Sequence, residues 1–101
     1  MIQKDVPADS KREFVYLKYV GHIAVMTGKL REPIGLEGVK TISELLSKLD
    51  EKYIGLREVF MPPGGVFNSR TAIILRRAGQ GSFSIVNEEE LIKEGDILTL
   101  W

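Results

Sequence analysis

Few residues of this chain have the types and spacing that autonomous catalysis needs. His22 is the only histidine, and no carboxylate stands out as its orienting partner, so a serine–histidine–carboxylate triad is not indicated. The chain has no cysteine, which excludes thiolate nucleophiles, thiolate zinc sites and disulfides. The stretch AGQGS, residues 78–82, lacks the lysine of a phosphate-binding loop. We therefore expect no catalytic residues, no metal, no cofactor and no enzymatic activity of its own.

Two charged clusters are candidates for binding rather than for catalysis. Residues 88–90 are three consecutive glutamates at the start of a predicted helical turn, where carboxylates stabilise the positive end of the helix dipole. Arg76 and Arg77, with Arg70 nearby, form the main basic cluster, which suits an acidic protein surface or a phosphate. A solvated helix start and a solvated strand end explain the same residues, so both interpretations stay open.

The overall composition argues against nucleic acid and membrane as partners. The 101 residues include 14 basic and 14 acidic side chains, so no net charge attracts polyanions. No apolar run approaches the roughly 18 residues of a membrane span, and the first residues do not resemble a signal peptide. We expect a cytoplasmic protein with one domain over residues 12–101, preceded by a flexible leader at 1–11.

Several segments have the residue pattern of β-strands. Residues 12–20 alternate, with Val15, Leu17 and Tyr19 on one face. Residues 22–27 lie between two glycines and either extend that strand or begin a hairpin. A weaker strand follows at 29–38, where Pro33 favours an edge position. Residues 71–77, 83–86 and 97–101 complete the set, and their inward-facing side chains are predicted to be Ile73, Leu75, Leu98 and Leu100.

The clearest helix covers residues 41–53. Thr41 and Glu44 have the spacing of a capping box, in which each residue binds the backbone of the other. The helix carries one apolar stripe, made of Ile42, Leu45, Leu46, Leu49 and Tyr53. Gly55 suits a left-handed end to this helix. Residues 60–70 are predicted to be a loop, and residues 87–95 a helical turn that Asn87 caps and Gly95 ends.

This order of elements predicts the fold class. Strands before and after one long helix imply an α+β protein, a mixed sheet of four to five strands packed on one main helix. Such an order is that of the ubiquitin-like β-grasp fold. Within that fold, residues 41–60, TISELLSKLDEKYIGLREVF, resemble the helix and following segment of the MoaD/ThiS family of small sulfur carriers. Residues 91–101, LIKEGDILTLW, resemble the family's Gly-Asp turn and final strand.

The resemblance covers residues 12–101 and implies a role in sulfur transfer or molybdenum-cofactor (molybdopterin) biosynthesis. The partners it implies are an E1-like adenylating enzyme and the large subunit of molybdopterin synthase. Family members carry a Gly-Gly tail after the last strand, slim enough to thread the partner's channel. This sequence stops at Trp101, and its only glycine pair, Gly64 and Gly65, is internal. We therefore expect docking to a partner enzyme without sulfur carriage. The alternative is a ubiquitin-like interaction module with no sulfur-transfer role.

An exposed apolar surface is the predicted site of partner binding. On the sheet face away from the helix, the sequence places Ile74, Ile97 and Trp101, with Arg76 and Thr99 beside them. A loop contributes Phe60, Met61 and Phe67. Large exposed apolar patches usually mark interaction sites, and tryptophan is a frequent anchor. Because so small a domain needs most of its apolar residues inside, the alternative is that some of these side chains belong to the core.

Overall fold

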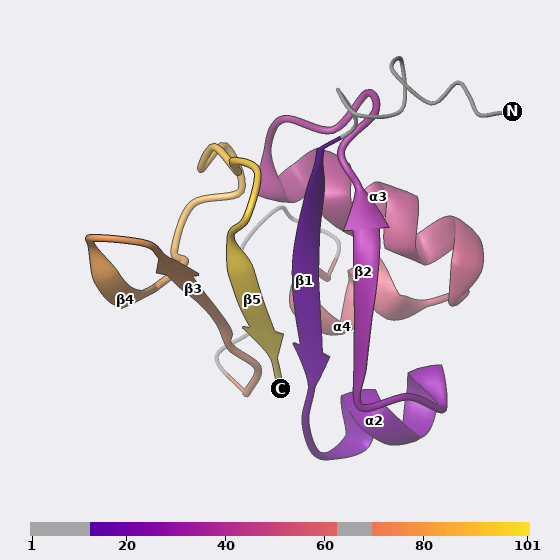
Figure 1. The fold of residues 1–101 in the computed structure, drawn as a ribbon. Helices are drawn as coiled ribbons and strands as arrows, with labels where there is room; N and C mark the ends of the chain where they lie inside the picture. Colours follow the sequence, from indigo (N-terminus) through magenta and orange to yellow (C-terminus); the bar gives the residue numbers. More distant parts are fainter. Residues whose placement is uncertain (1–12, 63–69) are drawn as a thin grey trace, which may run out of the picture.

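The computed structural model describes residues 13–62 and 70–101, which form a five-stranded mixed sheet with helices on one face (Figure 1). The strands lie in the order β2-β1-β5-β3-β4. Strands β1 and β5 are parallel, and every other neighbouring pair is antiparallel. Their bounds are β1 Phe14–Tyr19, β2 Arg31–Gly35, β3 Ile73–Arg77, β4 Gly81–Ser84 and β5 Ile97–Leu100. The predicted leader lies outside the described residues.

Three helices accompany the sheet: α2 His22–Thr27, α3 Ile42–Lys52 and α4 Leu56–Phe60. Helices α3 and α4 lie behind the sheet in the view of Figure 1, and no helix crosses the sheet face toward the viewer in the described part of the chain. The core therefore lies between the sheet and α3. This arrangement confirms the predicted α+β fold with one main helix.

The strand alternation predicted from the sequence is confirmed by burial. Val15, Leu17 and Tyr19 of β1 are buried, and their neighbours Tyr16 and Lys18 are exposed. The other inward-facing positions that the sequence predicted are also buried, namely Ile73, Leu75, Leu98 and Leu100. Pro33 lies on β2, an edge strand, where a missing backbone N–H interrupts no ladder. Local alternation was sufficient here because one face of each strand is buried.

Helix α3 begins as predicted. The Thr41 hydroxyl accepts a hydrogen bond from the Glu44 N–H at 3.2 Å, and a Glu44 carboxylate oxygen accepts from the Thr41 N–H at 3.2 Å. The end of the helix differs from the prediction. Tyr53 caps α3, and Gly55, at φ +94°, begins α4 instead. The Asp50 carboxylate fixes this change of direction, because it accepts from the Gly55 N–H at 3.0 Å and the Arg57 N–H at 3.1 Å.

Residues 22–27 form a helix, so the prediction of an extended strand or a hairpin is wrong. Gly21 and Gly28 both have positive φ angles and let the chain turn at each end of α2. The Gly28 N–H donates to the Ala24 carbonyl at 2.8 Å. Ile23 and Thr27, four residues apart, are buried, and the Thr27 hydroxyl donates to the Ile23 carbonyl at 3.0 Å. Burial of one helical face outweighs the β-branched composition.

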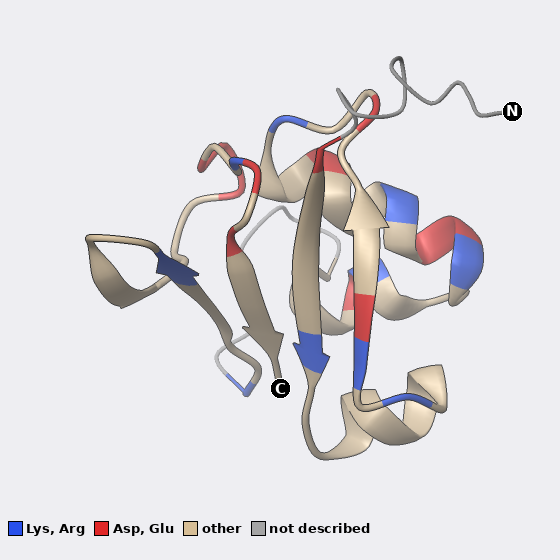
Figure 2. Ribbon diagram, viewed as in Figure 1, with Lys and Arg blue, Asp and Glu red and all other residues tan. Residues whose placement is uncertain are grey.

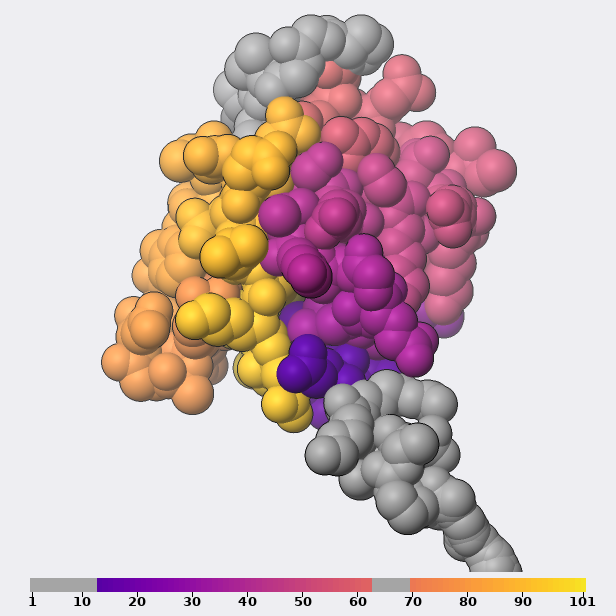
Figure 3. Space-filling view, turned by 90° about the horizontal axis from the view of Figure 1, so that it is seen from above, coloured from indigo at the N-terminus to yellow at the C-terminus, as the bar shows by residue number. Residues whose placement is uncertain are grey.

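Residues 87–95 contain no helix, which corrects a second prediction. Asn87 does act locally, because its side-chain oxygen accepts from the Glu89 N–H at 2.8 Å. The segment then runs beside the start of α3 (Figure 3). The Ile42 N–H donates to the Glu90 carbonyl at 3.0 Å, and the Ser43 N–H to the Glu88 carbonyl at 2.8 Å. Two of the N–H groups that a helix start leaves unpaired are thus satisfied by a distant segment.

Candidate docking surface on the uncovered sheet face

The sheet face away from α3 and α4 presents two rows of side chains. Strand registers place Tyr16 beside Pro33 and Ile97, and Lys18 beside Arg31 and Thr99. The same registers extend each row across β3 and β4. The ten residues that we call the outer face are Pro33, Tyr16, Ile97, Arg76 and Ser82 in one row, and Arg31, Lys18, Thr99, Ile74 and Ser84 in the other.

Four of the predicted partner-binding residues lie together on the outer face. Ile97 is opposite Arg76, and Thr99 is opposite Ile74, in adjacent positions of the β5–β3 ladder. Trp101 follows on the same side by alternation, and its side chain is 51% exposed. Its backbone is held to Ala72 by reciprocal hydrogen bonds of 2.6 and 3.0 Å. The predicted apolar residues therefore lie on one face of the sheet, where Ile97 and Ile74 are diagonal neighbours in the ladder, and their role in binding a partner stays a prediction.

Phe60 and Met61 do not belong to this surface. Phe60 is 0% exposed and Met61 is 6% exposed, so both are part of the core. Phe60 ends α4 on the same helical face as the buried Leu56, four residues earlier. The sequence prediction treated both residues as an exposed loop because it did not include α4. The alternative interpretation, that small domains keep such residues inside, holds for these two. Phe67 lies outside the described residues.

Six outer-face residues were not among the candidates, namely Ser82 and Ser84 of β4 and four residues of β1 and β2. Tyr16, Lys18, Arg31 and Pro33 are exposed, and Tyr16 keeps 53% of its surface accessible. With Ile97 and the neighbouring Leu17 and Glu32, they line a hollow of about 270 Å³ across β2, β1 and β5. The alternation of β1 already pointed Tyr16 and Lys18 away from the core. Their position beside Ile97 depends on the parallel pairing of β1 with β5. This pairing joins segments far apart in the sequence, so no local sequence pattern predicts it.

The charged side chains of the outer face all have the same sign. Lys18, Arg31 and Arg76 are exposed, and no carboxylate is among the ten residues (Figure 2). Arg77, the other arginine of β3, faces the opposite side and is bound to Asp96 at 2.9 Å from Nε and 2.7 Å from Nη2. This bidentate hydrogen bonding raises the pKa of Arg77. Arg77 is therefore structural, and Arg76 is the arginine of β3 that a partner can reach.

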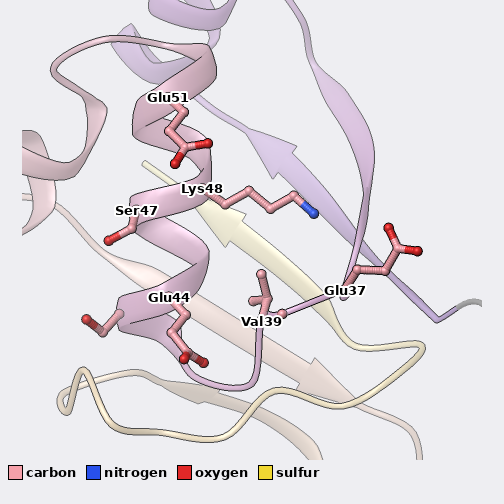
Figure 4. A pocket seen from close by; sticks show the side chains of 8 residues that line it. Glu37, Val39, Glu44, Ser47, Lys48 and Glu51 are labelled. Carbon is pink, nitrogen blue, oxygen red and sulfur yellow. The ribbon is translucent and has the colours of Figure 1, made fainter.

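A second hollow, of about 400 Å³, lies beside α3 (Figure 4). Two of its charged side chains, Lys48 and Glu44, already bind backbone groups of the chain. The Lys48 ammonium donates to the Gly35 carbonyl at 2.7 Å, and Glu44 accepts from the Lys40 N–H at 2.7 Å in addition to its capping bond.

In the ranges 13–62 and 70–101, no group of three or more acidic, histidine or cysteine side chains is placed to hold a metal ion. No helix of the same ranges is long and apolar enough to cross a bilayer.

No protein-family model matches the sequence, and neither does any curated protein. Solved structures nevertheless match most of the chain. Small archaeal modifier protein 1 from Haloferax volcanii aligns with a TM-score of 0.66 and 16% identity, over 87% of this chain and 92% of that one. The Methanosarcina acetivorans protein of the same name gives a TM-score of 0.63 and 18% identity, over 88% and 91%.

A third matching structure comes from Pyrococcus furiosus. A Pyrococcus furiosus protein assigned as molybdopterin converting factor, subunit 1, aligns with a TM-score of 0.65 and 19% identity, over 87% of this chain and 94% of that one. The chain therefore has the ubiquitin-like β-grasp fold of small modifier and MoaD/ThiS-like proteins. The resemblance and the fold class expected from the sequence are confirmed at this level.

Proposed function

We propose that this chain is a MoaD/ThiS-like protein of sulfur transfer or molybdenum-cofactor biosynthesis, and that it acts in the cytoplasm by docking its outer face onto a partner enzyme. The observation that carries the proposal is the uncovered sheet face, where Tyr16, Ile97, Ile74 and Trp101 form one apolar strip between three cations. Sheet faces exposed to water are usually polar, and apolar strips of this kind commonly mark interaction sites.

The proposed partners are an E1-like adenylating enzyme or the large subunit of molybdopterin synthase. Support comes from the sequence resemblance at residues 41–60 and 91–101, and from the name of the Pyrococcus furiosus structure. In this proposal the partner supplies the chemistry, and this protein supplies a rigid surface. The two buried carboxylates, Glu32 and Asp96, are consistent with that division, because both are held by cations of the chain itself.

The test is a charge placed at the centre of the outer face. Ile97→Asp should abolish binding to the adenylating enzyme or the synthase subunit of the same organism, because docking would bury an unpaired carboxylate. Isothermal titration calorimetry with the purified partner measures the affinity, and thermal melting confirms that the variant folds. Ile54→Asp is the matched control, since Ile54 is 87% exposed and lies in the turn between α3 and α4. Equal binding by both variants would show that the outer face is not the docking surface.

A second candidate is a ubiquitin-like interaction module with no sulfur-transfer role. The names of the two archaeal modifier proteins favour it. The two functions differ in their effect on the cell. Deleting the gene should lower the molybdopterin or thiamine content under the first function and leave both unchanged under the second, and re-expression of the Ile54→Asp variant should restore a lowered content.

A further inference from the structure

Two cations of the outer face are directly opposite each other. Lys18 of β1 pairs with Arg31 of β2. The Tyr19 N–H donates to the Leu30 carbonyl, and the Leu36 N–H to the Glu13 carbonyl, both at 2.9 Å. These bonds mark hydrogen-bonded pairs of the ladder. Because such pairs alternate with non-bonded pairs, Lys18 and Arg31 occupy a non-bonded position, where opposite side chains are closest. Like charges in this position destabilise a sheet.

Nothing in the described part of the chain compensates this repulsion. Other cations near β2 are paired, since Lys29 and Lys52 both contact the Glu32 carboxylate on the core side of the strand. Lys18 and Arg31, which are opposite each other in the β1–β2 ladder, form no hydrogen bond or ion pair with residues of the ranges 13–62 and 70–101. The pair is thus costly to the isolated domain and available to a ligand.

Lys18 and Arg31 form one end of the outer-face hollow, and its apolar end lies two residues away along both strands. Tyr16 precedes Lys18 by two positions, Pro33 follows Arg31 by two, and Ile97 lies beside Tyr16. Two residues of an extended strand span about 6.7 Å. The surface therefore presents a doubly cationic position and an apolar position at the spacing with which an extended peptide presents side chains i and i+2 on one side.

We propose that Lys18 and Arg31 bind a carboxylate of an extended, acidic and apolar segment of the partner, whose apolar side chain two residues away occupies the hollow of Tyr16, Pro33 and Ile97. This inference rests on the proposed function, because it names the chemistry that the docking partner presents to the outer face. The guanidinium of Arg31 can hold a carboxylate bidentately, and Lys18 adds a second donor. A nucleic acid matches less well, since the chain has no net charge and the cations adjoin an apolar hollow.

The binding test uses three dodecapeptides, acetylated and amidated at their ends. The first has three Glu-Ser-Leu-Ser repeats, the second replaces Glu by Gln, and the third replaces Leu by Ser. Titration followed by ¹⁵N–¹H NMR should shift the amides of Lys18, Arg31 and Ile97 with the first peptide. The second and third should bind at least three- to tenfold more weakly, as expected for loss of an ion pair or of an apolar contact.

Variants of the protein make the test independent of the peptides. The double variant Lys18→Gln, Arg31→Gln should bind the first peptide as weakly as the wild type binds the second. Lys40→Gln, which changes an exposed lysine that precedes α3 and is not part of the outer face, should bind as the wild type does. Lys18→Gln alone should melt at the same temperature as the wild type or higher, because repulsion is removed. A lower melting temperature would mean that the pair is structural and would overturn the inference.

The remaining outcomes separate this inference from the proposed function. Equal affinity for the Glu and Gln peptides, with shifts still on the outer face, would overturn carboxylate recognition and leave the docking surface standing. Shifts elsewhere, or none, would also overturn the inference, and the Ile97→Asp measurement would then decide the function alone. Tighter binding of a twelve-nucleotide oligothymidine to the same residues would assign the pair to nucleic acid instead.

Discussion

Glu32 is a carboxylate on the core side of an edge strand, and four side chains hold it there. It accepts hydrogen bonds from the Tyr19 hydroxyl at 2.9 Å, the Tyr53 hydroxyl at 2.7 Å and the Lys29 ammonium at 3.1 Å, and it contacts the Lys52 ammonium. Burial alone would raise the pKa of Glu32. The bonds from Lys52, Tyr53, Lys29 and Tyr19 outweigh burial and lower this pKa to about 2. One carboxylate thereby joins β1, β2 and α3.

This cluster predicts how stability depends on pH. A lowered pKa in the folded state means that Glu32 contributes stability above pH 4.5 that is lost as pH falls from about 4.5 to about 2. The contribution is on the order of 2–3 kcal/mol, since the two lysines are half exposed and solvent screens them. Urea unfolding at a series of pH values should show this loss in the wild type. This loss of stability at low pH should be absent in Glu32→Gln and retained in Glu51→Gln, which changes an exposed carboxylate. An equal loss in the wild type and both variants would show that Glu32 is not its source.

Asp96 holds the other end of the sheet in a similar way. It is 1% exposed, and besides Arg77 it accepts from the Lys93 N–H at 2.8 Å. Asp96→Asn should lower the free energy of unfolding by up to about 3–5 kcal/mol, because the partly buried Arg77 side chain, 16% exposed, would lose its counterion. Arg76→Gln, at the neighbouring exposed position, should change it by less than about 0.5 kcal/mol. Chemical denaturation of both variants gives the comparison, and similar small effects would mean that the ion pair is dispensable.

Among the elements, α3 depends on both local and distant residues. Its capping box and apolar stripe are local, but its first N–H groups bind carbonyls of residues 88 and 90. Arg57 of α4 adds to this junction, since its guanidinium donates to the Ser43 carbonyl at 2.8 Å. The helix therefore joins the sheet, α4 and the 87–92 segment into one unit.

Leu46→Asp tests this role of α3. Leu46 is 0% exposed, so the substitution places an unpaired carboxylate in the core at a cost of several kcal/mol, comparable to the whole stability of a domain this size. We expect no cooperative melting transition by circular dichroism at 25 °C and above. Ser47→Asp, one residue further and exposed, should melt near the wild-type temperature. A folded Leu46→Asp protein would contradict the packing described here.

The elements also show what the sequence can predict and why the rest escapes it. The stripe of α3 and the alternation of β1 follow from local periodicity, and the edge position of Pro33 follows from its missing backbone N–H. The structure confirms all three. The helical state of α2 and the non-helical conformation of residues 87–92 depend on residues distant in sequence. Local composition therefore predicted the wrong conformation for both segments. The same holds for the candidate site. Alternation was enough to find Ile97 and Arg76 and to direct Lys18 away from the core, but the pairing of Lys18 with Arg31 required the strand order.

At the scale of the whole molecule, helices cover one face of the sheet, no described residue covers the other, and we propose that this other face binds the partner. Phe60 and Met61 were predicted to be exposed but are buried in the core. The exposed residues beside Ile97 are instead Tyr16 and Pro33. This difference between prediction and structure has a physical reason. A small domain must bury the apolar side chains of its short helices, whereas a sheet that helices cover on one side leaves alternate strand positions in water.

Strand β5 lies between β1 and β3 at the middle of the sheet, although it follows every other strand along the chain. During synthesis, β1 and β3 therefore leave the ribosome before β5, and the edges that pair with β5 stay unpaired until residues 97–100 follow. Until those residues emerge, the growing polypeptide exposes the strand edges that invite association with other nascent chains. The newly synthesised chain thus avoids aggregation only if β5 pairs rapidly or if chaperones shield these edges.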